Sequence, residues 1–141
     1  MATNSEHGQH AKKLATFALS PATSSNSEMQ VTALFYACLH MFEATAYELN
    51  PKHGLSDHYT THTDRRAFLN NVSYTSPFAP VVRDYKILQS YSERSRYLSL
   101  RATSKYFPLT SADIADAKTL YQDIKRELED ILKNEGKKVP W

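Results

Sequence analysis

Glycine is scarce in this chain, and that scarcity restricts the possible folds more than any other feature. Only Gly8, Gly54 and Gly136 occur among 141 residues, and they stand far apart. β-Hairpin turns and glycine-rich phosphate loops depend on residues that tolerate positive φ. The sequence therefore predicts an all-α protein and excludes Walker-type and dinucleotide-binding loops. Any phosphate group would have to be held by side chains.

The length and composition indicate a single helical domain over residues 1–141, with a core at about residues 5–133. A domain typically takes about 100–200 residues. Apolar residues make up 41% of the chain, which excludes wholesale disorder. The tail, residues 134–141, is expected to be flexible unless Trp141 docks.

Three features indicate a cytoplasmic location. The longest unbroken apolar run, residues 33–39, is too short to span a bilayer. The polar, acidic N-terminus lacks the basic start and apolar stretch of a secretory signal. Cys38 is the only cysteine, so no internal disulfide can form.

Hydrophobic periodicity and capping residues predict five helices, at about residues 5–19, 28–49, 62–70, 80–108 and 110–133. Ser25 with Glu28 is interpreted as a capping box for the second helix, and Thr110 with Asp113 as the cap of the fifth. The second helix carries an apolar stripe that must be buried: Val31, Phe35, Cys38, Phe42, Ala46 and Leu49. Cys38 falls inside this stripe, where a thiol is an inert core residue.

All six histidines lie in the first 62 residues, which raises the question of a metal site. His58 and His62 have the four-residue spacing of a metalloprotease helix, but Tyr59 stands where that motif requires Glu. No third ligand follows at helical spacing. We therefore expect exposed loop histidines, no metal and no cofactor.

A second stripe on the second helix consists of Tyr36, His40, Glu43 and Tyr47. A histidine beside a carboxylate and aromatic rings can be tuned for general acid–base chemistry. The alternative is an ordinary helix–helix contact in which these amphipathic side chains bury their rings and hydrogen-bond at their polar ends.

The fourth helix carries the clearest charge feature, a stripe that includes Arg83, Arg94, Tyr97 and Arg101. Residues 83–105 contain six basic residues against two acidic ones, a net charge of +4, whereas the whole chain carries +2. Arginines interleaved with an aromatic residue suit phosphate contacts and base stacking, so RNA or a nucleotide is a reasonable partner. The alternative is pairing with the acidic side chains of the fifth helix.

Residues 28–100 resemble the HEPN (higher eukaryotes and prokaryotes nucleotide-binding) superfamily. The run from Tyr36 to His40 is similar to its Tyr-Tyr-Ala-x-x-His helix. The segment from His62 to Arg66 is similar to its Ser/Thr-His-x-x-Arg motif, and residues 95–97 match its Ala/Ser-Arg-Tyr pattern. The order and spacing of the three motifs carry the resemblance.

The resemblance implies an up-and-down bundle of four to five helices, commonly dimeric, in a bacterial or phage toxin–antitoxin or antiviral defence setting. Active members are metal-independent endoribonucleases with an Arg-x(4–6)-His motif, in which His moves a proton and Arg balances charge. Here every Arg follows every His, so that motif is absent.

Three functional hypotheses follow from these patterns. The first is a small, dimeric, RNA- or nucleotide-binding module using Arg83, Arg94, Tyr97 and Arg101. The second is a metal-independent endoribonuclease toxin, and the third is a non-catalytic adaptor for an antitoxin or defence-system protein. The nuclease would use His40, His62, Arg66 and Arg96, and the supporting residues in either case would be Tyr36, Glu43, Tyr47 and Arg65.

Overall fold

The computed structural model describes residues 3–23, 26–50, 55, 59, 61–97 and 109–141. These residues form five α-helices and one short 3₁₀ turn, and they contain no strand. The helices are α1 (Asn4–Ala18), α2 (Ser27–Leu49), α3 (His62–Asn70), α4 (Ala79–Tyr97) and α5 (Ser111–Asn134), with the 3₁₀ turn η1 (Pro21–Thr23) between α1 and α2. The all-α prediction is confirmed for this part of the chain. The expected end of the fourth helix, near Pro108, falls outside the described residues.

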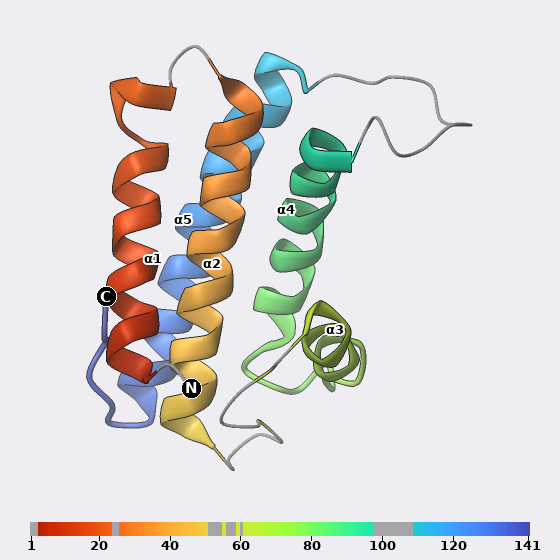
Figure 1. Ribbon diagram of the computed structural model, residues 1–141. Helices are drawn as coiled ribbons and strands as arrows, with labels where there is room; N and C mark the ends of the chain where they lie inside the picture. The colour runs from red at the N-terminus through yellow and green to blue at the C-terminus, as the bar shows by residue number, and fades with distance from the viewer. Residues whose placement is uncertain (1–2, 24–25, 51–54, 56–58, 60, 98–108) are drawn as a thin grey trace.

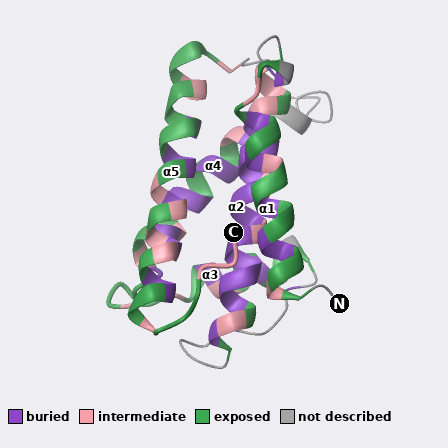
Figure 2. Ribbon diagram, turned by 90° about the vertical axis from the view of Figure 1, so that its left-hand side faces the viewer, coloured by how far each residue is buried: buried purple, intermediate pink, exposed green. Residues whose placement is uncertain are grey.

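Helix α2 is the centre of the molecule. It packs against α1, α4 and α5, and Figure 1 shows it between α1 and α4 with α5 behind. Every residue of its predicted apolar stripe, from Val31 to Leu49, is buried, which confirms that prediction. Burial also extends to Leu34 and Met41, beyond the stripe, because helices cover α2 on several sides (Figure 2).

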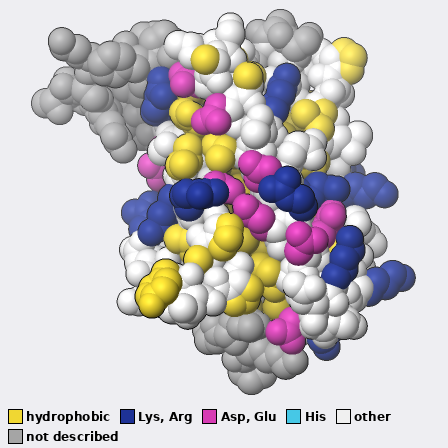
Figure 3. Space-filling view, turned by 180° about the vertical axis from the view of Figure 1, so that it is seen from behind, with side chains coloured by type: hydrophobic (Ala, Val, Ile, Leu, Met, Phe, Trp, Pro, Cys, Tyr) yellow, Lys and Arg dark blue, Asp and Glu magenta, His cyan; other side chains and the backbone are white. Residues whose placement is uncertain are grey.

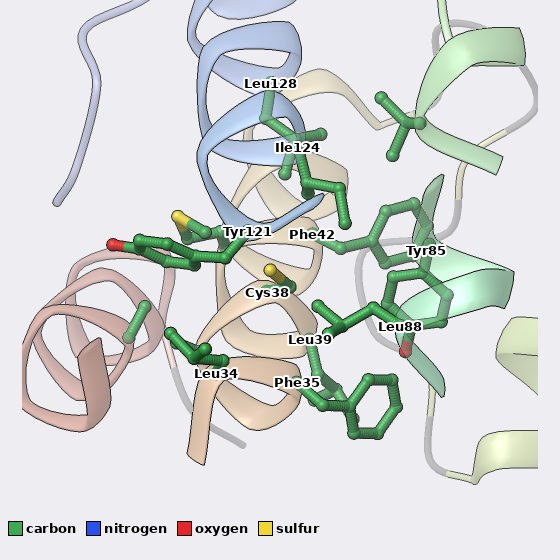
Figure 4. Close-up of a cluster of buried hydrophobic side chains, with 14 of the residues drawn as sticks. Leu34, Phe35, Cys38, Leu39, Phe42, Tyr85, Leu88, Tyr121, Ile124 and Leu128 are labelled. Atoms are coloured by element: carbon green, nitrogen blue, oxygen red, sulfur yellow. The ribbon is translucent and has the colours of Figure 1, made fainter. Parts of the chain in front are cut away.

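Aromatic side chains join α2 to α3 and α4. The ring of Phe42 lies 5.8 Å from Phe68 of α3 and 6.2 Å from Tyr85 of α4, measured between centroids. Figure 4 shows Tyr85 and Leu88 of α4 facing α2. Full burial of such a side chain contributes about 1.5–3 kcal/mol, so this cluster holds α3 and α4 against α2.

The helix starts follow local capping chemistry. The hydroxyl of Thr110 accepts the Asp113 N–H (3.1 Å), and the Asp113 carboxylate accepts the Thr110 N–H (2.9 Å), which confirms the predicted start of α5. The predicted cap of α2 is wrong by one residue. Asn26 is the N-cap, and its side-chain oxygen accepts the Met29 N–H (2.9 Å), because Asn caps a helix as well as Ser does.

The C-terminal tail lies along the other elements. The indole N–H of Trp141 donates to the Glu129 carboxylate of α5 (3.1 Å), and Val139 and Trp141 pack against the core. Pro140 contacts α1 at Gly8, where a Cβ would overlap its carbonyl oxygen. The docking of Trp141 that the sequence left open is therefore present.

Among the described residues, no helix combines the length and the apolar character that crossing a membrane requires.

Candidate functional site

Three imidazoles meet where α1 packs against α2, so the expectation of exposed loop histidines is wrong for His7, which is buried, and for His40, which lies within α2. The Nδ1 atoms of His7 and His40 are 3.0 Å apart, so one ring donates a hydrogen bond and the other accepts it. His10 stands edge-on to His40 with ring centroids 4.5 Å apart. Burial, and then the neighbouring imidazoles, lower the pKa of His40 from 6.5 to about 4. The His40 ring is therefore neutral at pH 7.

Glu43 lies one turn further along α2, and both of its carboxylate oxygens accept hydrogen bonds from other parts of the chain. Its Oε1 accepts a hydrogen bond from the Arg65 guanidinium (2.8 Å), and its Oε2 accepts the Tyr59 N–H (3.3 Å). Arg65 also donates to the Tyr59 carbonyl oxygen (3.4 Å), and both charged side chains are buried. This ion pair ties α3 and the backbone at Tyr59 to α2.

The flanking tyrosines of the same stripe differ in exposure. Tyr36 is half-buried and packs edge-on against Phe35, with ring centroids 5.5 Å apart. Tyr47 is 37% exposed. The stripe thus carries an imidazole cluster and a buried ion pair, with an aromatic ring at each end.

The two arginines of the basic stripe that the structure describes each meet a carboxylate. Arg83 donates to Asp84 (3.0 Å), its neighbour on α4, yet its own side chain is 72% exposed. Arg94 pairs with Asp113 of α5 (3.4 Å) and lies over the Tyr91 ring. Pairing with α5, the alternative raised for the fourth helix, holds for Arg94. Figure 3 shows acidic and basic side chains interleaved across this side of the molecule.

Several predicted site residues have side chains outside the described part of the chain. His62 is the first residue of α3, and Arg96 and Tyr97 end α4, but only their backbone is described. Arg101 lies within residues 98–108, which are not described. Of the predicted nuclease set, His40 is therefore placed in the imidazole cluster and Arg66 on the exposed face of α3.

A hollow of about 320 Å³ lies between α3 and α4, with Leu69 and several polar side chains in its lining. Arg66 and Lys86 supply its positive charge, and Glu93 pairs with Arg66 at 3.4 Å. Lys86 has no ion pair with any described residue. The amides of Asn70 and Gln89 and the hydroxyl of Ser90 also line the hollow. It combines a net positive charge with neutral hydrogen-bonding groups.

Sequence reasoning missed this hollow as a unit. Lys86, Gln89, Ser90 and Glu93 recur at three- and four-residue spacing and so share one face of α4. That spacing was the available signal. No pattern within one helix could predict that His7 and His10 lie beside His40, because His7 and His40 are 33 residues apart in the sequence.

Within the described residues, no group of three or more His, Cys, Asp or Glu side chains is arranged to hold a metal ion. Cys38 is fully buried, and burial raises the pKa of its thiol well above the usual value. Its predicted role as a core residue is confirmed.

Comparisons of the chain with protein-family models, with curated proteins and with solved structures gave no match.

Proposed function

We propose that this protein is a small HEPN-like module, an up-and-down helical bundle that binds RNA or a nucleotide through its phosphates. The hollow between α3 and α4 is the binding site in this proposal. The motif order along α2, α3 and α4 supports the HEPN-like fold. The absence of glycine-rich loops supports binding by side chains.

The observation that carries this proposal is the net positive charge of the side chains that line the hollow. The Arg66–Glu93 pair is long and exposed, and such pairs contribute about 0–1 kcal/mol, so a phosphate can displace the carboxylate. Lys86 forms no ion pair with a described residue, although Glu93 lines the same hollow. The neighbouring amides of Asn70 and Gln89 suit sugar hydroxyls or phosphate oxygens.

The arginine stripe has a secondary role in this proposal. Arg94 is held by Asp113 and by the Tyr91 ring, which makes it less available than Lys86. Arg83 is largely exposed despite its contact with Asp84, so it extends the positive surface along α4. A strand longer than one nucleotide would reach both the hollow and this surface.

Binding of a fluorescein-labelled single-stranded RNA, followed by anisotropy over a range of salt concentrations, tests the proposal. Affinity should fall steeply with salt, and Lys86→Ala and Arg66→Ala should each weaken binding and reduce the salt slope by about one. Lys118→Ala removes an exposed lysine of α5 and is the matched control. Binding that ignores salt, or that Lys118→Ala weakens as much as Lys86→Ala does, would overturn the proposal.

The His7–His40 pair favours a second candidate, a metal-independent endoribonuclease. Two imidazoles lie within hydrogen-bond distance of each other there, and the imidazole is the side chain most often used for general acid–base catalysis. Incubation of diverse RNAs with the protein in EDTA tests it, with His40→Gln as the variant that should abolish cleavage. If every RNA stays intact, the binding module stands without the nuclease.

The resemblance also suggests a second copy of this chain as partner, in a toxin–antitoxin or defence setting. Light scattering after size exclusion would give the mass, and a mass twice the 16.1 kDa of the chain is expected. A monomer that also fails to bind RNA would leave the adaptor hypothesis, which co-purification with a partner protein tests.

A further inference from the structure

A second cavity, of about 320 Å³, lies between α1 and α5. Ala11 and Ala15 of α1 form one wall, Met41 of α2 lines it, and Tyr121 of α5 and the Trp141 indole complete it. Figure 2 shows the C-terminus lying between α1 and α5. The cavity shares no lining residue with the hollow between α3 and α4. Its volume is at the lower end of the range for small-molecule sites, about 300–1,000 Å³.

The hydroxyl of Tyr121 has no hydrogen-bond partner among the described residues, although this residue is only 5% exposed. Figure 4 shows the hydroxyl pointing toward α1. Burial raises the pKa of Tyr121 to about 12, so the hydroxyl keeps its proton at neutral pH. The hydroxyl oxygen is not one of the buried unpaired atoms, and Tyr121 lines the cavity, so the hydroxyl can donate a hydrogen bond to a ligand there.

Lysine side chains give the cavity a net positive charge. Lys125 is paired with Glu129 (2.9 Å), and the same carboxylate oxygen accepts the indole N–H of Trp141, so this carboxylate is already compensated. Lys12 also lines the cavity and has no ion pair with a described residue. The excess charge therefore belongs to Lys12.

We infer that this cavity binds a small organic carboxylate with an apolar body, such as the anion of a medium-chain fatty acid. The apolar body packs against Ala15, Met41 and the Trp141 indole. The carboxylate accepts hydrogen bonds from the Lys12 ammonium and the Tyr121 hydroxyl. The positive charge disfavours a cationic ligand, and the two donors distinguish a carboxylate from an alcohol of the same length.

Trp141 is the only tryptophan and lines the cavity, so its intrinsic fluorescence reports directly on occupancy. The full chain is titrated with decanoate below its micelle concentration, with 1-decanol and with decyltrimethylammonium. Decanoate should give a saturable change, decanol an affinity at least about threefold weaker, and the ammonium compound none. No saturable change with decanoate, or an equal response to the ammonium compound, overturns the inference.

Variants locate the site. Lys12→Gln should weaken decanoate binding by about threefold to tenfold, and Tyr121→Phe should also weaken it. Lys13→Gln changes an exposed lysine outside the cavity lining and should have no effect. Ala15→Phe should abolish binding because the ring fills the cavity. If that variant unfolds, Lys12→Gln against Lys13→Gln decides, and equal affinities for those two variants overturn the inference.

Discussion

The side chains of Glu43 and Arg65 show how one buried charge pair can determine the position of a helix. The carboxylate of Glu43 receives hydrogen bonds from Arg65 and from the Tyr59 backbone, so its two oxygens are both used. An isolated buried charge is costly, whereas a paired and hydrogen-bonded one is tolerated. We therefore interpret both residues as structural supports of the α2–α3 contact.

Glu43→Ala should lower the free energy of unfolding by about 3–5 kcal/mol, because it leaves the Arg65 guanidinium buried without its counter-charge. Urea unfolding followed by circular dichroism measures the loss. Asp130→Ala removes an exposed carboxylate of α5 and should change stability by no more than about 0.5 kcal/mol. A Glu43→Ala protein as stable as that control would show that the ion pair contributes nothing.

His40 should make stability depend on pH in the acid range. Its pKa is about 4 in the folded protein against 6.5 as the ordinary value, so the unfolded chain binds more protons between these pH values. Stability is then fully present above pH 6.5 and is lost as the pH falls toward 4. The charged and titratable groups around it are His7, His10 and Arg65.

His40→Gln should remove about 1 kcal/mol of the loss between pH 7 and pH 4.5, a value reduced for solvent screening because the ring is only half buried. Urea midpoints of both proteins at the two pH values provide the measurement. Identical pH slopes for the variant and the parent protein would contradict this account of the imidazole cluster.

At the scale of the elements, α4 and α5 meet along a polar seam. The Tyr91 hydroxyl donates to Asp116 (2.6 Å), and Arg94 pairs with Asp113 (3.4 Å).

Further along, Asp84 Oδ2 and Glu127 Oε2 are both buried without a hydrogen-bond partner among the described residues. Burial, and then the neighbouring Asp84 carboxylate, raise the pKa of Glu127 to about 8, because only a protonated Glu127 can donate a hydrogen bond to Asp84. The Arg83 guanidinium lies 3.0 Å from the other oxygen of Asp84.

Glu127→Gln should stabilise the protein at pH 8 to 9 by about 1 kcal/mol, after allowance for the partial exposure of this side chain. A raised pKa means that the folded protein holds a proton that the unfolded chain releases above about pH 4.5, so stability falls between pH 4.5 and 8. The variant should not show that fall. Thermal unfolding at pH 5, 7 and 9 tests this, and Asp130→Asn, an exposed position on the same helix, serves as control. A fall of the same size in Glu127→Gln would contradict the shared-proton interpretation.

At the scale of the whole molecule, the C-terminal tail links the end of α5 to the start of α1. Pro140 passes so close to Gly8 that the helix has no room for a side chain there. Beside it, Trp141 packs against the core and donates to Glu129. The first helix and the last segment of the chain therefore stabilise each other.

Gly8→Ala tests this contact, because alanine normally stabilises a helix interior by about 0.5–1 kcal/mol relative to glycine. Here the new methyl group should displace the tail, lower stability by about 1–3 kcal/mol and shift the Trp141 emission to longer wavelength. Fluorescence spectra and thermal unfolding give both quantities. A more stable protein with unchanged emission would show that the tail does not depend on this contact.

The helices, the cap of α5 and the buried stripe of α2 could be predicted because periodicity and capping are local. Phe35, Phe42 and Leu49 repeat at helical spacing, and Thr110 lies three residues from Asp113. The site could be predicted only in part. His40 and Glu43 share a stripe in the sequence, but the imidazoles beside His40 come from α1, and Arg65 lies 22 residues from Glu43.

By itself the sequence determined that the chain is helical, which faces are apolar and where the positive charge concentrates, since each of these properties depends on residues within a few turns. Only the tertiary structure decided which charged side chains form ion pairs and which have no ion-pair partner. It placed Arg94 against Asp113 and Glu43 against Arg65, and it left Lys86 and Lys12 without carboxylate partners among the described residues. The physical reason is that charge pairing and burial depend on distances between helices, which no spacing along one helix specifies.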